Sequence, residues 1–172
     1  MNVKDAIINR HSVRSFSEKE VPIHIIYDII LHAHLAPSAG NLQARDFIIV
    51  NDPKVKRMLC KAALNQEFLI EAPIDIVVCA NLDRIKRYGK RGMELYCIQD
   101  AAAAVEHILL LAVDYGLAGC WVGAFNEAEA IQILDLPPHI RPVAIIPLGY
   151  QKGNVEPTSR MEIKKLIHLD KW

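Results

Sequence analysis

The chain has 172 residues, of which 52% are hydrophobic and 23% charged, so it holds enough apolar material for one sizeable core and a mainly disordered chain is excluded. We expect a single domain over residues 1–172, because two domains would each be near the lower practical size. Lys plus Arg and Asp plus Glu both number 20, which gives zero formal net charge and excludes recruitment of nucleic acid or an anionic membrane by the field of the whole protein.

The first half of the chain predicts helices around one short strand. Ser17 and Glu20 have the spacing of a capping box before the second helix, and Pro37 ends that helix because the residue before a proline disfavours helical geometry. In chain order we expect a helix over 2–10, an extended segment over 11–16, a helix over 22–36, a loop over 37–41, a strand over 47–50 and a helix over 54–63.

The second half alternates strands and helices, which favours a mixed sheet with helices packed on both faces. The long helix is apolar nearly all round, so we expect it to be buried on most sides. The tail 151–172 is polar with isolated apolar residues and would have to be held by partners. The expected elements are strands over 74–80, 120–122 and 143–148 and helices over 94–115 and 127–134.

The sequence reads as that of a soluble, cytoplasmic protein. The N-terminus lacks an apolar run suited to a secretory signal, and the apolar stretch 101–113 is broken by Glu106 and His107 and falls short of a membrane span. The four cysteines have no metal-ligand spacing, so we expect buried free thiols in a reducing compartment.

The first candidate site is Arg10-His11-Ser12-Val13-Arg14. Two arginines four residues apart share a face, and in a strand Ser12 lies on that face between them. Forked donors with a hydroxyl suit a phosphate group. The alternative is a solvated basic edge after the first helix.

Two further segments combine small residues with neutral polar groups. In 37–43, Pro-Ser-Ala-Gly-Asn-Leu-Gln, small residues would let the backbone approach a flat ligand, and the amides and hydroxyl would supply donors and acceptors. In 119–125, Gly-Cys-Trp-Val-Gly-Ala-Phe, Gly123 would leave backbone N–H groups free to face a ligand. A plain turn and a strand with a buried Trp are the respective alternatives.

The order and separations of these three segments resemble those of the FMN-dependent nitroreductase family, over essentially the whole chain. Further landmarks are Asn65-Gln66 before Glu71-Ala72-Pro73, then Gln99-Asp100-Ala101-Ala102 and Pro147-Leu148-Gly149-Tyr150. Each motif is weak alone, but their joint order is specific. The resemblance implies an α+β fold, a three-layer α/β/α sandwich with a mixed, mainly antiparallel central sheet.

The resemblance also implies a flavin site shared by two chains of a homodimer. In the family the first segment holds the flavin phosphate and ribityl chain and reaches the pyrimidine edge, the second comes from the other subunit, and amides of the third approach N5 and O4. A basic residue near the C-terminus completes the phosphate site. The corresponding residues are Arg10, His11, Ser12 and Arg14; Pro37, Ser38, Ala39, Asn41 and Gln43; Val122, Gly123 and Ala124; and Arg160, with Asn65 as a further candidate for the flavin edge or substrate.

The implied function is an FMN-dependent oxidoreductase that uses NADH or NADPH in a ping-pong mechanism to reduce nitroaromatic, quinone or similar small acceptors. No catalytic side chain is expected, because the cofactor carries the chemistry. Two alternatives stay open: a same-fold flavoenzyme with other chemistry (dehalogenase, flavin-fragmenting or azoline dehydrogenase-like), and a non-catalytic FMN carrier or sensor. Independently, the apolar stretch 101–111 exceeds what a small core needs to cover, which favours a dimer.

Some features depart from the family pattern or stand outside it. Ala44-Arg45 follows Gln43 where many members have Pro-Trp, which would alter the pocket wall, and Thr158 stands where larger relatives place a second basic residue. The helical insertion of longer members is lacking. The basic run 84–91 is expected to be a solvated face, with binding of an NAD(P)H phosphate as the alternative. His32 and His34 lie on different helix faces, so no metal site is expected.

Overall fold

The strands of the protein form one sheet in a computed structural model that describes residues 1–156 and 158–172. Its order is β1-β2-β4-β3, and each neighbouring pair is antiparallel. An isolated parallel bridge joins Ser12 to Gly119. This arrangement confirms the expected, mainly antiparallel sheet. The strands are β1 (Arg45–Val50), β2 (Ile74–Asn81), β3 (Ala118–Gly119) and β4 (Ile140–Gly149).

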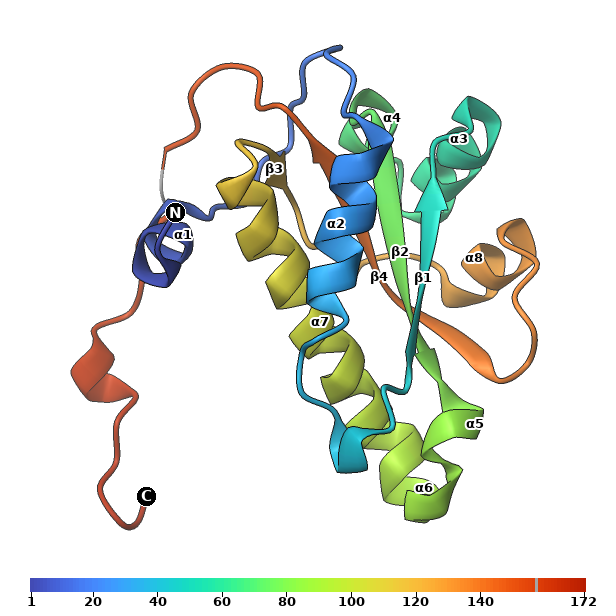
Figure 1. Ribbon diagram of the computed structural model, residues 1–172, viewed down its shortest axis with the longest axis vertical. Coiled ribbons are helices and arrows are strands. Elements are labelled where there is room, and N and C mark those ends of the chain that lie inside the picture. The colour runs from blue at the N-terminus through green and yellow to red at the C-terminus, as the bar shows by residue number, and fades with distance from the viewer. Residues whose placement is uncertain (157) are drawn as a thin grey trace.

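Helices cover both faces of this sheet, which confirms the three-layer α/β/α architecture. Figure 1 shows α2 and α7 on one face and α3, α4 and α8 on the other. The helices are α1 (Val3–Asn9), α2 (Ile23–Ala33), α3 (Pro53–Ala62), α4 (Phe68–Glu71), α5 (Leu82–Ile85), α6 (Gly89–Arg91), α7 (Cys97–Asp114) and α8 (Glu127–Ile133), with short 3₁₀ turns η1 (Ala39–Asn41), η2 (Lys86–Tyr88) and η4 (Ile163–Lys165) and a π-helical turn η3 (Gly92–Tyr96).

The alternation of side chains along β2 divides the core into two halves. Ile76 and Val78 face α2 and α7, whereas Val77 and Cys79 join the cluster of α3, α4 and α8. All residues of β2 are buried. A strand covered on both faces needs apolar residues on both, which explains the continuous run Ile-Val-Val-Cys-Ala. Each such aliphatic side chain contributes about 1.5–3 kcal/mol when fully buried.

The second helix begins within one residue of its predicted start, but without the predicted capping box. Pro22 is the N-cap residue of α2 and makes no side-chain cap hydrogen bond. The Ser17 amide instead donates to the carbonyl of Tyr150 at 2.9 Å, next to a bridge between Phe16 and Gln151. Ser17 therefore belongs to an extended pairing, and the capping-box prediction is wrong.

The long helix and the strand after it also differ from their predicted bounds. Helical structure continues from Leu82 through the π turn η3 into α7, instead of starting at Glu94. The predicted strand 120–122 is replaced by β3, which ends at Gly119, and by a single bridge between Val122 and Ile145. The chain crosses the sheet edge here with too few paired residues to form a longer strand.

The helical stretch Leu82–Asp114 is the one segment of the described residues that is long and apolar enough to cross a membrane by length and composition. Eight residues of α7 are buried, among them Ala101, Val105 and Ile108. They pack against α2 and the central strands β2 and β4. This burial is that of a core helix, as its apolar composition predicted.

The C-terminal tail leaves the domain after β4. In Figure 1 it runs away from the sheet, past α1, and ends apart from the rest of the chain. Its apolar side chains are exposed; they are Met161, Ile163, Leu166, Ile167, Leu169 and Trp172. A single chain therefore offers these side chains no core, as the composition of the tail predicted.

Candidate functional site

The segment Arg10–Arg14 lies beside β3 in extended conformation. The Val13 amide donates to the carbonyl of Gly119 at 3.0 Å, and Ser12 forms the parallel bridge to the same residue. Val13 is fully buried, packed with Phe16 and Ala72. Because side chains alternate along an extended backbone, Ser12 and Arg14 project to the opposite side from Val13. The structure thus brings the first and third candidate segments together within one chain.

The two arginines of this segment carry positive charge that no acidic side chain balances. In the part of the chain that the structure describes, no ion pair joins Arg10 or Arg14 to a carboxylate. Burial raises the pKa of the Cys120 thiol, and Arg14, Ser12 and Arg10 all act on it in the opposite direction, which places them near this sulfur. Uncompensated arginines at one point favour an anion there.

A hollow of about 200 Å³ adjoins this segment. Arg10 and His11 line it together with Gly119 and Gln151. The His11 ring is held on both sides, with Nδ1 at 2.8 Å from the carbonyl of Asn9 and Nε2 at 3.1 Å from Oε1 of Gln151. Gln151 in turn donates to the carbonyl of Gly153, where the tail begins. The hollow therefore connects the arginine segment with the root of the tail.

The third segment presents backbone to solvent from Gly123 onward. The Val122 amide donates to the carbonyl of Ile145 at 3.0 Å, so Val122 is engaged in pairing and cannot offer its N–H to a ligand. Gly123 and Ala124 are exposed, and within the described residues their amides have no backbone partner. The predicted amide contacts are thereby narrowed to these two residues.

Asn65 lies close to this backbone. Its neighbour Gln66 donates from Nε2 to the carbonyl of Ala124 at 3.1 Å. Leu64 and Asn65 both have left-handed backbone, with φ of 59° and 58°. Such conformations cost free energy and concentrate at functional positions. The structure therefore brings the residue next to Asn65 into contact with the third segment, and the role of Asn65 itself stays a prediction.

The loop 37–43 lies at the other end of the molecule. Its Ala39 amide donates to Oδ1 of Asp100, in the first turn of α7, at 2.9 Å. Arg10–Arg14 adjoins Gly119, beyond the last turn of the same helix. α7 has 18 residues and is about 27 Å long, which is longer than an FMN molecule. Within one chain the loop and the arginine segment therefore do not form a common site.

The loop borders a separate, open hollow of about 410 Å³. It is lined by Pro37, Ser38 and Ala39 and by Tyr96, Gln99, Asp100 and Ala103 of η3 and α7. Asp100 is buried, and its Oδ2 has no hydrogen-bond partner among the described residues. The side chains of Asn41 and Gln43 bond to each other, with Gln43 Nε2 donating to Asn41 Oδ1 at 2.9 Å. The loop thus places two polar side chains, fixed by a hydrogen bond to each other, close to this hollow.

Arg160 is not joined to the other predicted basic residues. In the described chain it donates only within its own segment, to the carbonyl and hydroxyl of Thr158 and to the carbonyl of Ser159. It is exposed in the tail. Within one chain no described contact joins Arg160 to Arg10 or Arg14, and its role at the phosphate stays a prediction.

The four cysteines are free and buried, which confirms the prediction of buried free thiols. Burial raises the pKa of each thiol, in the case of Cys79 to about 12. A thiol in this state carries little thiolate at neutral pH, and the thiolate is the nucleophile. The cysteines are therefore packing residues. Among the described residues, no group of three His, Cys, Asp or Glu side chains gathers as a metal site.

Arg45 is the residue whose role the sequence did not reveal. It is 2% exposed, and its guanidinium donates to four carbonyls, those of His34, Ala36, Pro37 and Asp100, at 2.6 to 3.2 Å. Arg45 also borders a hollow together with Gln43 and Arg84, so the expected change to a pocket wall at this position stays a prediction. The signal in the sequence was an Arg at the start of an apolar strand, where a buried cation needs hydrogen-bond acceptors. Four carbonyls accept from its two terminal nitrogens, while its Nε has no partner among the described residues.

Comparison with known proteins accounts for this combination of fold and site. The model of the nitroreductase family matches residues 7–66 and 55–150. A protein of Methanothermobacter thermautotrophicus, provisionally named NADH dehydrogenase/NAD(P)H nitroreductase, is 30% identical over 100% of this chain and 88% of its own length. An FMN reductase (NADPH) of Bacillus subtilis is 27% identical, over 87% of this chain and 66% of the relative.

Solved structures agree with these sequence comparisons. A nitroreductase family protein from Clostridium novyi is 32% identical and superposes with a TM-score of 0.81, covering 88% of this chain and 86% of that one. The match of the family model over more than half of the residues, together with the shared fold, shows that the chain belongs to the nitroreductase family.

Proposed function

We propose that this protein is a homodimeric flavoenzyme that passes electrons from NAD(P)H to nitroaromatic, quinone or similar acceptors in a ping-pong order. As a member of the nitroreductase family, the chain is an NAD(P)H-dependent oxidoreductase with FMN as its cofactor. The order of reaction, the acceptor, the cofactor contacts and the dimer are the proposed part.

The observation that carries the proposal is the division of the candidate residues between two ends of one chain. Ser12 of the arginine segment pairs with Gly119 of β3, past the end of α7, whereas Ala39, in the loop that carries Asn41 and Gln43, contacts Asp100 in the first turn of α7. The backbone after β3 continues to Ala124, which Gln66 contacts. Two such chains, packed so that each loop meets the other's arginine segment, would form two complete sites. A symmetric dimer satisfies this requirement with one repeated interface.

The residues present fit FMN. Arg10 and Arg14 lack acidic partners in the described chain and provide the positive charge that a phosphate dianion needs. The free amides of Gly123 and Ala124 and the side-chain amides of Asn41, Gln43 and Asn65 match the polar edge of an isoalloxazine ring, which both donates and accepts hydrogen bonds. Arg160 would add to the phosphate site.

When bound, FMN supplies hydride transfer between the nicotinamide and the acceptor. The residues of this chain bind and orient the cofactor and stabilise negative charge near it. Arg14 and the amide of Gly123 would perform this last role, because fixed donors aimed at developing charge give electrostatic stabilisation without reorganisation. No side chain has to exchange a covalent bond.

Exposed apolar surface supports the proposed dimer. Tyr27 and Leu31 on α2 and Leu35 in the turn after it form an apolar stripe, the α2 stripe, with exposed fractions of 61%, 63% and 73%. The apolar side chains of the tail are exposed as well. Contiguous apolar patches on a monomer mark sites of association. We also propose a cytoplasmic location, because four free thiols require reducing surroundings.

The proposal is tested with purified protein. We expect a flavin absorbance spectrum, oxidation of NADH or NADPH on addition of a quinone or nitroaromatic, parallel lines in double-reciprocal plots at varied acceptor, and a dimer by size-exclusion chromatography with light scattering. A protein that takes up no FMN, or a stable monomer of 19.3 kDa that does, would refute the shared site. FMN binding without NAD(P)H turnover would favour the carrier or sensor, and turnover confined to other substrates would favour a same-fold enzyme of different chemistry.

A further inference from the structure

The loop that carries Asn41 and Gln43 has an unusual backbone. Gly40, Asn41 and Gln43 all lie in the left-handed region, with φ of 55°, 55° and 50°. Glycine and asparagine tolerate this region, whereas glutamine adopts it at a cost in free energy. Strained residues persist only when the surroundings determine their conformation. The contacts that hold this loop therefore matter for where the two amide side chains lie.

Arg45 holds the loop from inside. Its Nη2 donates to the carbonyls of His34 at 2.7 Å and Ala36 at 2.6 Å, and its Nη1 to those of Pro37 at 3.2 Å and Asp100 at 3.0 Å. The first three carbonyls follow α2, where a helix leaves acceptors without partners. One buried cation thus joins the end of α2 and the start of the loop to α7.

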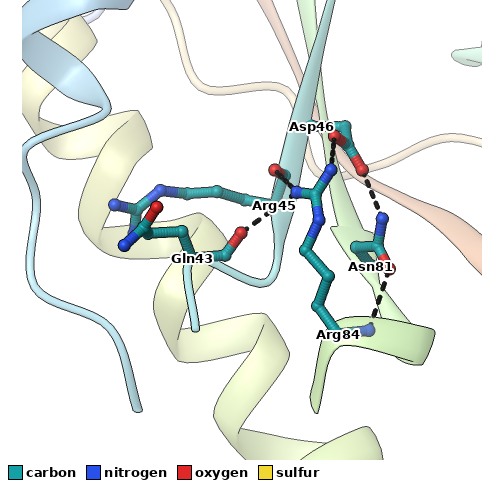
Figure 2. A network of polar contacts seen from close by, with 5 residues as sticks. All are labelled: Gln43, Arg45, Asp46, Asn81 and Arg84. Carbon is teal, nitrogen blue, oxygen red and sulfur yellow. Dashed lines mark hydrogen bonds and ion pairs between the residues drawn. The ribbon is translucent and has the colours of Figure 1, made fainter. Parts of the chain in front are cut away.

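Arg84 holds the loop from outside. Its Nη1 donates to the carbonyls of Gln43 at 3.1 Å and Arg45 at 2.7 Å, and its Nη2 pairs with Oδ1 of Asp46 at 2.7 Å. Asn81 completes the arrangement, donating to Oδ2 of Asp46 at 2.7 Å and accepting from the amide of Arg84. Figure 2 shows this closed network, with the guanidinium of Arg45 directed away from Arg84.

The other cations of the basic run are engaged in ways that bear on its role. Arg87 donates to the carbonyl of Gly40 at 3.2 Å, which is a third contact to the same loop. Lys86 pairs with Asp83 at 2.5 Å, and Arg91 donates to the hydroxyl of Tyr96. Arg84 and Arg87 of the run thus donate hydrogen bonds to backbone carbonyls of the loop. The alternative in which the run binds the phosphate of NAD(P)H stays a prediction.

An isolated exposed ion pair contributes little, so the pair of Arg84 and Asp46 alone would carry no argument. Here the same guanidinium also satisfies two carbonyls that flank Ala44, and Asp46 is fixed by a second donor. Networks of charged hydrogen bonds exceed the sum of isolated pairs. The Gln43 carbonyl is fixed by Arg84, and its amide donates to Oγ of Ser38 at 3.0 Å. Both sides of the strained residue are therefore held.

We propose that Arg45 and Arg84 are positioning residues that hold the loop 37–43 in the conformation in which Asn41 and Gln43 meet the flavin of a neighbouring chain. This inference rests on the proposed function. Their described partners are backbone carbonyls and Asp46, so in the proposed site both arginines would act through the loop. Because the two arginines already fix the loop, it loses less conformational entropy when FMN binds. Preorganisation of this kind increases affinity.

The test uses Arg84→Met in the full-length protein, with Lys86→Met as the matched control, because both variants remove one exposed cation from the same run. The affinity of the FMN-free protein for FMN is measured by quenching of flavin fluorescence. We expect Arg84→Met to weaken FMN binding about tenfold, Arg84→Lys to restore part of it, and Lys86→Met to leave it unchanged. Hydrogen exchange of peptides covering 38–46, measured without FMN, should accelerate in Arg84→Met alone.

The outcomes separate the two proposals. Wild-type FMN binding with an unchanged dissociation constant in Arg84→Met overturns the positioning role and leaves the proposed function intact. Equal weakening in Arg84→Met and Lys86→Met overturns it too, since general charge would then explain the loss. Wild-type protein that binds no FMN overturns both proposals, while exchange in 38–46 still reports whether the arginine holds the loop. Arg45→Met would leave four buried carbonyls without this donor and is expected to unfold the protein. The Arg84 variants are therefore the ones that test the proposal.

Discussion

Asp75 is a carboxyl group inside the core that no described donor satisfies. It lies on β2 opposite Pro147, which has no N–H, and on the side of the sheet that faces α3. Lys56 of α3 is also buried and donates to the carbonyls of Ile70, in α4, and Ala72, directly after it. Burial raises the pKa of Asp75 to about 8, and the charge of Lys56 opposes this rise. The carboxyl is therefore mostly protonated at neutral pH.

This protonation predicts a pH-dependent stability. Unfolded, Asp75 ionises near 3.8, whereas folded it keeps its proton up to about 8, so wild-type stability falls as pH rises through this window. Asp75→Asn has no such proton. Its free energy of unfolding relative to wild type should therefore increase by at least about 1 kcal/mol between about pH 5 and about pH 8, since one pKa unit corresponds to about 1.4 kcal/mol. Urea unfolding at both pH values measures this difference, with exposed Glu18→Gln as the control. A difference that stays constant with pH would show that Asp75 does not titrate in this range.

At the scale of elements, β3 is placed by the absence of a side chain at Gly119. A Cβ there would lie 2.8 Å from Cδ2 of Leu148 and 3.0 Å from the carbonyl oxygen of Pro147, both in β4. Gly119 also pairs with Ser12 on its other side. One methyl group at this position would require the Leu148 side chain to turn away and the Pro147 carbonyl to move by a few tenths of an ångström.

We expect Gly119→Ala to lower the free energy of unfolding by about 1–3 kcal/mol, the usual cost of overpacking. Gly123→Ala is the control for stability, because its Cβ would meet only Nε1 of Trp121, at 4.0 Å. Chemical unfolding of the FMN-free proteins compares them. If both variants were as stable as wild type, the close approach of β3 to β4 would not constrain this position.

The sequence predicts elements well where periodicity or composition dominates. The buried strand β2 and the helix α7 follow from continuous apolar residues. It fails where long-range pairing decides. Ser17 has the local spacing of a cap, but its amide donates to the carbonyl of Tyr150, which lies far away in the sequence. Local patterns do not reveal such partners.

The candidate site shows the same division. The order of the motifs indicates Arg10–Arg14 and Asn41–Gln43, and the donors and acceptors of these residue types suit a flavin. Arg45 and Arg84 are not legible, because their roles depend on carbonyls that the fold brings to them. The sequence also led us to include the Val122 amide among the candidate ligand contacts. Only the fold shows that this amide already pairs with the carbonyl of Ile145.

At the scale of the whole molecule, the two halves of the proposed flavin site lie at opposite ends of α7. The loop adjoins Asp100 at one end, and the arginine segment adjoins Gly119 past the other. The tail and the α2 stripe add apolar surface that one chain leaves uncovered. In the proposed arrangement a single chain holds two half-sites, and a second chain completes each of them.

A heterodimer of two defective chains tests this requirement most directly. One chain carries Arg10→Ala and Arg14→Ala, and the other carries Asn41→Ala and Gln43→Ala. The two chains are purified together through different affinity tags. A shared site predicts that each mutant homodimer binds FMN weakly, whereas the heterodimer binds about one FMN per two chains with wild-type affinity, because one of its sites combines intact arginines with an intact loop. A heterodimer that binds FMN as weakly as both homodimers would place the whole site within one chain and contradict the account.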